Sequence, residues 1–253
     1  MNSVWLKNVE VGAGKPKVIV PIVAATEEEI LEKAKSLLGL QFDVVEWRVD
    51  FYEDAQSVER VLQVLRGLRG MLGEIPILAT FRTKKEGGER EIPMDAYTQL
   101  NAAMAQSGLV DAVDVEILSG DAVVAENIRK IHQAGVAVVG SSHEFTCTPP
   151  REELIARLCK EQEMGCDILK LAVMPRNAGD VLTLLGATEE MNRCHARQPV
   201  VTMSMSGQGV ISRLCGEIFG SAMTFGAVGQ VSAPGQVQIE DLNAVLQMIH
   251  DAV

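Results

Sequence analysis

The sequence lacks the features that mark secreted and membrane proteins. Its first residues, Met1 to Gly12, contain neither the basic segment nor the apolar run of a signal peptide. Its longest apolar runs fall far short of the about 20 residues that a helix needs to cross a bilayer. Cysteines are also few: the five present are odd in number, irregularly spaced and without a Cys-x-x-Cys pair. We therefore expect free thiols in a reducing compartment, a cytoplasmic location and no membrane partner.

Several cofactor and catalytic motifs are missing as well. No Gly-x-Gly-x-x-Gly turn follows an expected strand, which argues against a dinucleotide-binding fold. There is no His-Glu-x-x-His motif, and Cys194-His195 has no further metal ligands at suitable spacing. A Ser-His-Asp triad would lack its nucleophile elbow. The sequence therefore gives no support to metal catalysis and favours chemistry performed by its own side chains.

Basic residues are scarce relative to acidic ones. The chain has 23 Lys and Arg against 34 Asp and Glu, a formal charge of −11, and no stretch in which basic residues cluster. Nucleic acid is thus a poor candidate for a partner. An anionic substrate would have to be bound by a few local arginines that act against the overall field.

The length and composition that remain are those of an ordinary globular protein. Of the 253 residues, 47% are hydrophobic and 23% charged. This length matches one (β/α)8 barrel, which has about 250 residues. No linker or shift in composition divides the chain, so we expect residues 1–253 to form a single barrel domain.

Short β-branched runs alternate with segments of helical periodicity, the pattern of repeated βα units. Eight strands are expected: Lys17 to Ala24, Asp43 to Val49, Pro76 to Phe81, Ala112 to Ile117, Val136 to Ser142, Asp167 to Val173, Pro199 to Met205 and Met223 to Val228. Eight units favour a closed TIM barrel over an open sheet, with the active site where the strands end. A short β-hairpin over Val4 to Val11 would close the barrel floor, and a frayed extension is the alternative.

Two helix starts carry capping residues. Thr26 with Glu29 forms the pattern of a capping box. Thr148 before Pro149 is expected to cap the helix that follows the fifth strand, because proline is favoured at the first helical position.

Charged residues share one face of the second expected strand. Side chains alternate in direction along a strand, so Val45, Trp47 and Val49 point one way. Glu46 and Arg48 point the other way. Charged residues at alternate positions of a barrel strand share one face, and they indicate a polar barrel interior near the carboxyl ends of the strands. An ion pair that satisfies itself is the alternative to a binding role.

Lys170 is the most informative single residue, because it interrupts the apolar run from Ile168 to Val173. Lysine is rarely buried without a partner or a function. A lysine that protects an edge strand from aggregation is the alternative, but a closed barrel has no edge. The pattern therefore favours a functional lysine.

Other polar residues gather at neighbouring strand ends. His143 ends the fifth strand, one strand before Lys170, and neighbouring strands lie about 4.8 Å apart, so the two side chains can meet. Arg82 ends the third strand and leads into a loop with glycines at 87 and 88. Met203 and Met205 share the inward parity of the seventh strand and are more simply explained by core packing. A lysine nucleophile beside a histidine base is the chemistry that remains.

These residues lie in segments that resemble type I 3-dehydroquinate dehydratase, a Schiff-base enzyme family. The resemblance spans the chain and rests on the joint order of its motifs. They are Glu46-Trp47-Arg48-Val49-Asp50, the Arg82 to Gly88 loop, Ser142-His143-Glu144-Phe145 before Thr148-Pro149, Asp167 through Lys170 to Pro175, Met203-Ser204-Met205 through Ser212-Arg213, and Ser232-Ala233-Pro234-Gly235-Gln236.

The resemblance implies a role for each matched residue. Lys170 would form the imine, His143 would act as general acid and base, and Glu86 would orient the histidine. The remaining implied residues bind substrate: Arg213 its carboxylate, Glu46 and Arg82 its ring hydroxyls, Ser232 and Gln236 on a closing loop, together with Arg48, Met203, Met205 and Phe225. The glycine-rich segment from Gly229 to Gln236 is expected to act as a lid. Pro21 departs from the family, because some relatives have a serine there.

The implied activity is that of a carbon–oxygen hydro-lyase. The family converts 3-dehydroquinate to 3-dehydroshikimate plus water in the shikimate pathway of aromatic amino acid biosynthesis, needs no cofactor and forms homodimers. A class I aldolase would use the same lysine to cleave a carbon–carbon bond, but the arginines and the segment from Ser232 to Gln236 favour a carboxylated ring. A catalytically inactive barrel that binds metabolites is a third reading, which the presence of both Lys170 and His143 disfavours.

Overall fold

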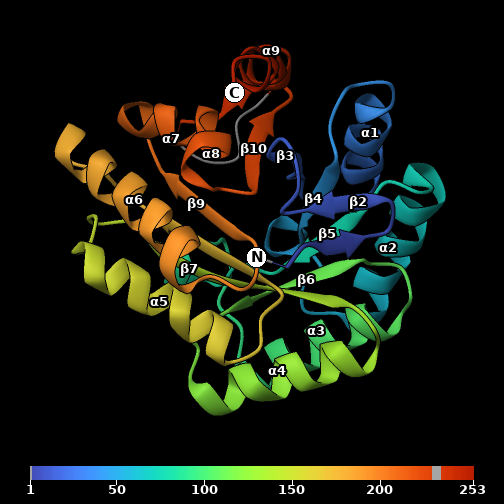
Figure 1. Cartoon of the computed structure of the whole chain (residues 1–253). Coiled ribbons are helices and arrows are strands. Elements are labelled where there is room, and N and C mark those ends of the chain that lie inside the picture. The colour runs from blue at the N-terminus through green and yellow to red at the C-terminus, as the bar shows by residue number, and fades with distance from the viewer. Residues whose placement is uncertain (1, 230–234) are drawn as a thin grey trace.

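The computed structural model describes residues 2–229 and 235–253. A ring of parallel strands lies at its centre, with helices around the outside (Figure 1). The strands of the ring are β3 (Lys17–Ile22), β4 (Val44–Arg48), β5 (Ile77–Thr80), β6 (Ala112–Glu116), β7 (Ala137–Glu144), β8 (Ile168–Val173), β9 (Val200–Ser204) and β10 (Met223–Ala227). Each overlaps one of the expected strands. The prediction of a (β/α)8 barrel is confirmed.

Helices follow the strands along the chain. They are α1 (Glu27–Leu37), α2 (Val58–Leu72), α3 (Met94–Gln106), α4 (Asp121–Gln133), α5 (Arg151–Glu163), α6 (Ala178–Glu190), α7 (Val210–Leu214), α8 (Gly216–Phe219) and α9 (Ile239–His250). Single helical turns lie between them at η1 (Val49–Phe51), η2 (Lys84–Glu86), η3 (Met191–His195) and η4 (Gly207–Gly209). In the described part of the chain, no helix is both long and apolar enough to cross a membrane. All five cysteines are free thiols.

The ring closes in two different ways. A regular parallel ladder joins β10 to β3. Within the described residues, β9 and β10 are joined instead through the isolated bridge between Val200 and Ser221, where the N–H of Ala222 donates to the carbonyl of Val200 at 2.7 Å. The short strand β11 (Val237–Gln238) extends the sheet beyond β10. The β9–β10 junction is therefore the weakest hydrogen-bonded seam of the ring.

The amino-terminal hairpin is confirmed. Strands β1 (Val4–Leu6) and β2 (Val9–Val11) pair antiparallel. Leu6 and Val11 are buried against the inward residues at the strand starts. These floor residues are Ile19, Val44, Leu78, Ala112, Val139, Ile168, Val201 and Met223. An apolar plug therefore closes the barrel at the end opposite the strand termini.

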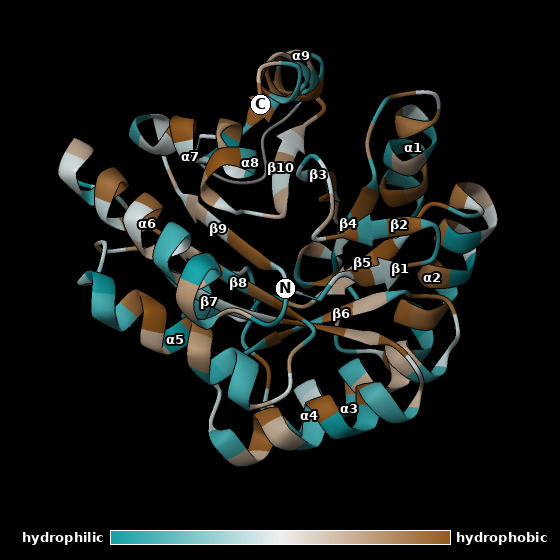
Figure 2. Ribbon diagram, viewed as in Figure 1, coloured by the Kyte–Doolittle hydropathy of each residue, from teal (hydrophilic) through white to brown (hydrophobic). Residues whose placement is uncertain are grey.

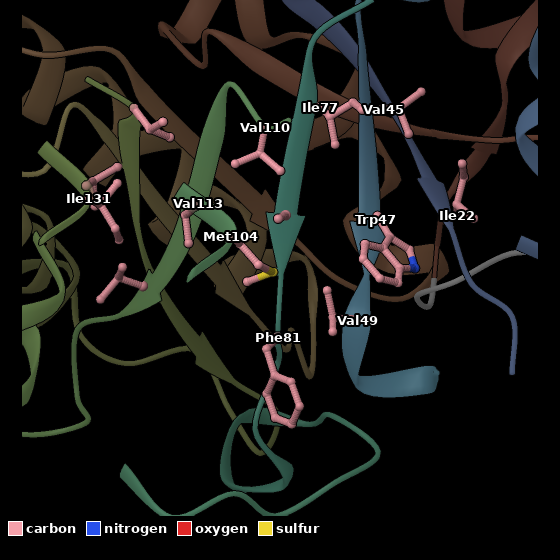
Figure 3. Close-up of a cluster of buried hydrophobic side chains, with 14 of the residues drawn as sticks. Ile22, Val45, Trp47, Val49, Ile77, Phe81, Met104, Val110, Val113 and Ile131 are labelled. Atoms are coloured by element: carbon pink, nitrogen blue, oxygen red, sulfur yellow. The ribbon is translucent and has the colours of Figure 1, made fainter. Parts of the chain in front are cut away.

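A second and larger core lies between the outer faces of the strands and the helices (Figure 3). Val45, Trp47 and Val49 belong to it, and none of the three is exposed. The alternation expected for the second strand is therefore correct. Much of the strand ring is apolar, whereas the helices carry both apolar and polar segments (Figure 2). Because both faces of the strands are covered, any charge on an inward face is removed from bulk water.

Local signals were only partly reliable guides to element ends. The capping box is confirmed: Glu29 N–H donates to the Thr26 hydroxyl, and the Glu29 carboxylate accepts from Thr26 N–H. The cap expected at Thr148 is wrong. Helix α5 begins at Arg151, after Pro150, and the Thr148 hydroxyl donates instead to the carbonyl of Met174 at 3.1 Å. The residue before a proline is pushed out of helical conformation, so the Pro149-Pro150 pair delays the helix.

The packing of the hairpin predicts a position-specific loss of stability. Leu6→Ala should lower the free energy of unfolding by about 2 to 4 kcal/mol, because it leaves a cavity in the floor core. Trp5→Ala is the matched control, since Trp5 precedes Leu6 in the same strand and is 61% exposed. Urea denaturation followed by circular dichroism measures both variants. Equal losses in the two would show that the hairpin does not seal the barrel.

Candidate active site

A pocket of about 190 Å³ lies at the carboxyl ends of the strands. Every residue that the sequence predicted for the site lines it except Ser232, which lies outside the described residues. The residues brought together are Glu46, Arg48, Arg82, Glu86, His143, Lys170, Met203, Met205, Arg213, Phe225 and Gln236. The sequence reasoning missed Phe51, Gly87, Glu89, Phe145 and Ala172, which complete the lining.

Lys170 lies in the middle of β8 and points into the barrel. Only 5% of its surface is exposed. Its Nζ lies 3.5 Å from Oδ2 of Asp114 and 5.0 Å from the ring centre of Phe225. Because β8 is flanked by β7 and β9, the edge-strand explanation for this lysine does not apply. The amine therefore lies between a carboxylate and the face of an aromatic ring.

Arg82 is the hub of a buried ion cluster beside the lysine. Its Nη2 lies 2.8 Å from Asp114, and its Nη1 lies 3.0 Å from both Glu116 and the hydroxyl of Ser141. The Ser141 hydroxyl donates in turn to Asp114 at 2.6 Å. These groups come from three adjoining strands, β5, β6 and β7, or from the residues that directly follow them. The cluster therefore ties the polar ends of these strands together.

The charges in this cluster stabilise one another. Burial opposes the charge on Arg82, but Asp114 and Glu116 outweigh it and raise the pKa of the guanidinium well above its usual value. Burial likewise opposes the charge on Asp114, but Arg82 and Lys170 lower the pKa of its carboxyl. Among residues 2–229 and 235–253, no group of His, Cys, Asp and Glu side chains is arranged to hold a metal ion.

His143 and Glu86 form a pair at the rim of the cluster. His143 lies within β7, which continues to Glu144 and so runs two residues beyond the expected end at Ser142. Oε2 of Glu86 accepts the main-chain N–H of His143 at 3.1 Å and lies 2.9 Å from its Nδ1. When Glu86 is ionised this oxygen accepts from both groups, so we assign the proton to Nδ1 in that state. The other ring nitrogen, Nε2, then carries a lone pair.

The environment of this pair disfavours charge on either partner. Burial lowers the pKa of the His143 imidazole well below its usual value, and the nearby cations Arg82, Lys170 and Arg48 act in the same direction. Burial also raises the pKa of Glu86 to about 8, although Arg82, 3.9 Å away, opposes this shift. The imidazole is therefore held in its uncharged form, as a proton acceptor must be.

The two charged residues of β4 have separate partners. Arg48 makes a bidentate pair with Asp50, with both N···O distances 2.9 Å, and its guanidinium lies 4.9 Å from the ring centre of Phe51. Glu46 accepts a hydrogen bond from the Thr80 hydroxyl at 2.9 Å. The alternative of a mutual ion pair between Glu46 and Arg48 is thus replaced by two independent contacts, and both side chains line the pocket.

Arg213 and the two methionines form the opposite wall. Arg213 is 2% exposed, its Nη1 lies 3.8 Å from the sulfur of Met203, and burial lowers the pKa of its guanidinium to about 10. A guanidinium that lines a pocket has the planar geometry to form a bidentate pair with a carboxylate. Met203 and Met205 pack in the inner core, as expected, and also line the pocket.

The expected lid is only partly described. Gly229 and Gln236 are described, and Gln236 lines the pocket, whereas residues 230–234, including Ser232, lie outside the described residues. The side-chain amide of Gln238, in β11, donates to the carbonyl of Gly229 and accepts from the Gly229 N–H.

Two polar residues of the buried ion cluster were missed by the sequence reasoning. Asp114 and Glu116 interrupt the apolar strand Ala112 to Ile117 on one parity, as Glu46 and Arg48 do in β4. The same rule of alternation would have found them. Phe145 was missed for a different reason: its ring packs where a side chain at position 87 would lie, 2.3 Å from a Cβ built on Gly87, and only the fold brings the two together.

Three comparisons relate the chain to known proteins. A family model described as type I 3-dehydroquinase matches residues 18–253. The 3-dehydroquinate dehydratase of Clostridioides difficile is 49% identical over 251 residues, which are 99% of this chain and 98% of that protein. The enzyme of the same name from Listeria monocytogenes is 49% identical over 250 residues, 99% of each chain.

Solved structures give the same result. The crystal structure of type I 3-dehydroquinate dehydratase from Clostridium difficile, with covalent modified comenic acid, superposes with a TM-score of 0.98, 49% identity and coverage of 100% of this chain and 99% of that chain. The 3-dehydroquinate dehydratase of Geobacillus kaustophilus has a TM-score of 0.96 at 39% identity, with 99% and 97% coverage.

The ion cluster predicts a strong dependence of stability on Asp114. Asp114→Asn should lower the free energy of unfolding by about 3 to 5 kcal/mol, because it leaves Arg82 and Lys170 buried with one fewer counter-charge. Asp121→Asn removes the carboxylate of an exposed pair with Lys160 and should cause no measurable change. Urea denaturation of both variants tests this, and a stable Asp114→Asn protein would contradict the proposed importance of the cluster.

Proposed function

Since the chain belongs to the type I 3-dehydroquinase family, we propose that it converts 3-dehydroquinate to 3-dehydroshikimate and water through an imine on Lys170. The enzyme is a hydro-lyase, and its reaction belongs to the shikimate pathway. One observation carries the mechanism: a buried lysine and an uncharged histidine line the same pocket. The covalent modified comenic acid in the Clostridium difficile relative also supports covalent chemistry in this family.

Lys170 is the nucleophile in this proposal. Its neutral amine attacks the C3 ketone, and the carbinolamine loses water to give a protonated imine. Asp114 lies close enough to hold the amine in place, at 3.5 Å, but is bound more closely by Arg82, at 2.8 Å. Because Arg82 shares this carboxylate, Asp114 is not paired with Lys170 alone.

His143 moves the protons. With Nδ1 donating to Glu86, Nε2 removes the proton from C2 of the imine, and the electron pair of that bond enters the enamine. The same imidazolium then protonates the C1 hydroxyl as it leaves, so the histidine returns to its uncharged form. Water hydrolyses the remaining imine, which releases 3-dehydroshikimate and restores Lys170. Glu86 stabilises the transient imidazolium.

The other residues of the pocket bind and orient the ring. We assign the substrate carboxylate to Arg213 and ring hydroxyls to Glu46 and Arg82, with Arg48, Met203, Met205, Phe225, Ser232 and Gln236 completing the binding site. Both Nη atoms of Arg82 are already engaged by Asp114, Glu116 and Ser141, so Arg82 also holds these groups in position. Pro21 pairs with Glu46 along β3 and β4, and it offers no hydroxyl there.

The family resemblance also suggests a cytoplasmic homodimer in which residues 1–253 of each chain form one domain. The chemistry of the pocket does not depend on the assembly or the location of the protein.

Trapping with borohydride separates the roles of the two central residues. Wild type with substrate or product should gain one reduced ligand mass on Lys170, and Lys170→Ala should gain none. His143→Ala keeps the amine, so it should still yield some adduct while its turnover falls by about 10² to 10⁴-fold. Mass spectrometry of peptides and the absorbance of the conjugated enone product measure the two effects. Adduct on another lysine, or turnover by Lys170→Ala, is incompatible with the mechanism.

The pair of His143 and Glu86 predicts the pH profile. When Glu86 is protonated it donates to Nδ1, so Nε2 carries the other proton and cannot act as a base. Activity should therefore rise with pH as the pair loses this proton, with an apparent pKa of about 8. Glu86→Gln retains an acceptor for Nδ1 but cannot titrate, so the acidic limb of kcat/KM should move to lower pH. An unmoved limb would show that another group controls it.

A further inference from the structure

A buried carboxyl lies directly behind Lys170, on the outer side of the barrel wall. Glu161 belongs to α5, and its side chain points toward β8. Its Oε2 accepts the main-chain N–H of Lys170 at 2.8 Å. Glu161 is completely buried, so this contact is sheltered from water. The side-chain amine of Lys170 thus points into the pocket, while its main-chain N–H donates to the carboxyl group of Glu161 on α5.

The packing around Glu161 is built for this close approach. Gly140 of the adjoining strand β7 has no side chain. A Cβ there would lie 3.3 Å from the Cβ of Glu161 and 2.5 Å from the sulfur of Cys166. The glycine therefore lets α5 approach the sheet closely enough for a glutamate side chain to reach the strand. In a packed core, such a contact constrains the strand at one residue.

The carboxyl is costly to bury, so its presence calls for an explanation. Burial raises the pKa of Glu161 well above its usual value, and Asp114 and Glu86 act in the same direction, whereas the hydrogen bond from Lys170 N–H opposes the shift. An uncharged acid can accept this hydrogen bond. It also adds no negative charge behind the lysine, where a carboxylate would favour the unreactive ammonium form.

We propose that Glu161 is a positioning residue for the reaction, whose carboxyl oxygen accepts the main-chain N–H of Lys170 and holds that residue so that its amine points at the substrate carbonyl. This inference rests on the proposed function of Lys170 as nucleophile. It assigns the helix side of the barrel wall a part in catalysis without contact with the substrate.

Three substitutions test the proposal. Glu161→Gln keeps an acceptor of the same length and carries no charge. Glu161→Met keeps the length without an oxygen, and Glu161→Asp keeps the carboxyl but shortens the side chain by one methylene, so it cannot reach the strand. The measurements are kcat, KM for 3-dehydroquinate and the rate of borohydride-trapped adduct on Lys170. Near-UV circular dichroism identifies variants that retain the packed fold.

The expected result is rescue by the uncharged acceptor. Glu161→Gln should keep kcat and the trapping rate within about threefold of wild type. Glu161→Met and Glu161→Asp should lose about tenfold in both while KM changes little, because a misplaced nucleophile slows attack without weakening binding. A structural role alone would change stability and leave these rates in the folded fraction unaltered.

Other outcomes overturn the inference. Wild-type trapping rates in folded Glu161→Met and Glu161→Asp would do so, as would a loss in Glu161→Gln equal to that in Glu161→Met. Failure of both Met and Asp variants to fold would assign Glu161 to stability instead. Failure of the proposed function has a different signature, because wild type would then form no adduct on Lys170.

Discussion

The site depends on one buried cation. Arg82 holds Asp114, Glu116 and the Ser141 hydroxyl around its guanidinium, and it lies 3.9 Å from Glu86. Without it, several carboxylates would lie close together in a region of low water content, where mutual repulsion is strong. With it, Asp114 stays ionised near the lysine and Glu86 is placed near the histidine. The nucleophile and the proton carrier are thus linked to the same guanidinium without touching it.

The barrel accommodates these buried charges because its apolar and polar interior residues lie at different levels along the strands. The floor is closed by the hairpin and by one apolar side chain from each strand. Farther along the same inward parity, the strands β4 to β8 carry Glu46, Thr80, Asp114, Ser141 and Lys170. The helices and the outer core provide the burial that supports the fold, because the polar layer contributes little net stability. Chemistry and stability therefore reside mainly in different layers of the molecule.

Much of this organisation is visible in the sequence, because alternation along a strand depends only on local geometry. The strand positions follow from the β-branched runs, Lys170 from its interruption of an apolar run, and His143 from its place at the end of the neighbouring strand, whereas the hairpin was one of two alternatives. The start of α5 does not, since Pro150 overrides the capping signal of Thr148. Glu161 was missed because it lies in the run Lys160-Glu161-Gln162-Glu163, which has the composition of a solvated helix face. Only the rotation of α5 against Gly140 places this one member against the strand, and that rotation is a property of the fold.

The seam between β9 and β10 has a consequence for ligand tolerance. These strands meet at the Val200–Ser221 bridge. They supply Met203 and Phe225 to the pocket, and Met205 directly follows β9. The opposite side of the pocket is tied by the ion cluster across β5, β6 and β7. Local structural fluctuations of the barrel should therefore be greatest at β9 and β10, where methionine side chains repack easily. An inhibitor enlarged toward the methionines would contact side chains that can repack to make room for it. An inhibitor enlarged equally toward His143 and Arg82 would contact side chains fixed by ion pairs and hydrogen bonds.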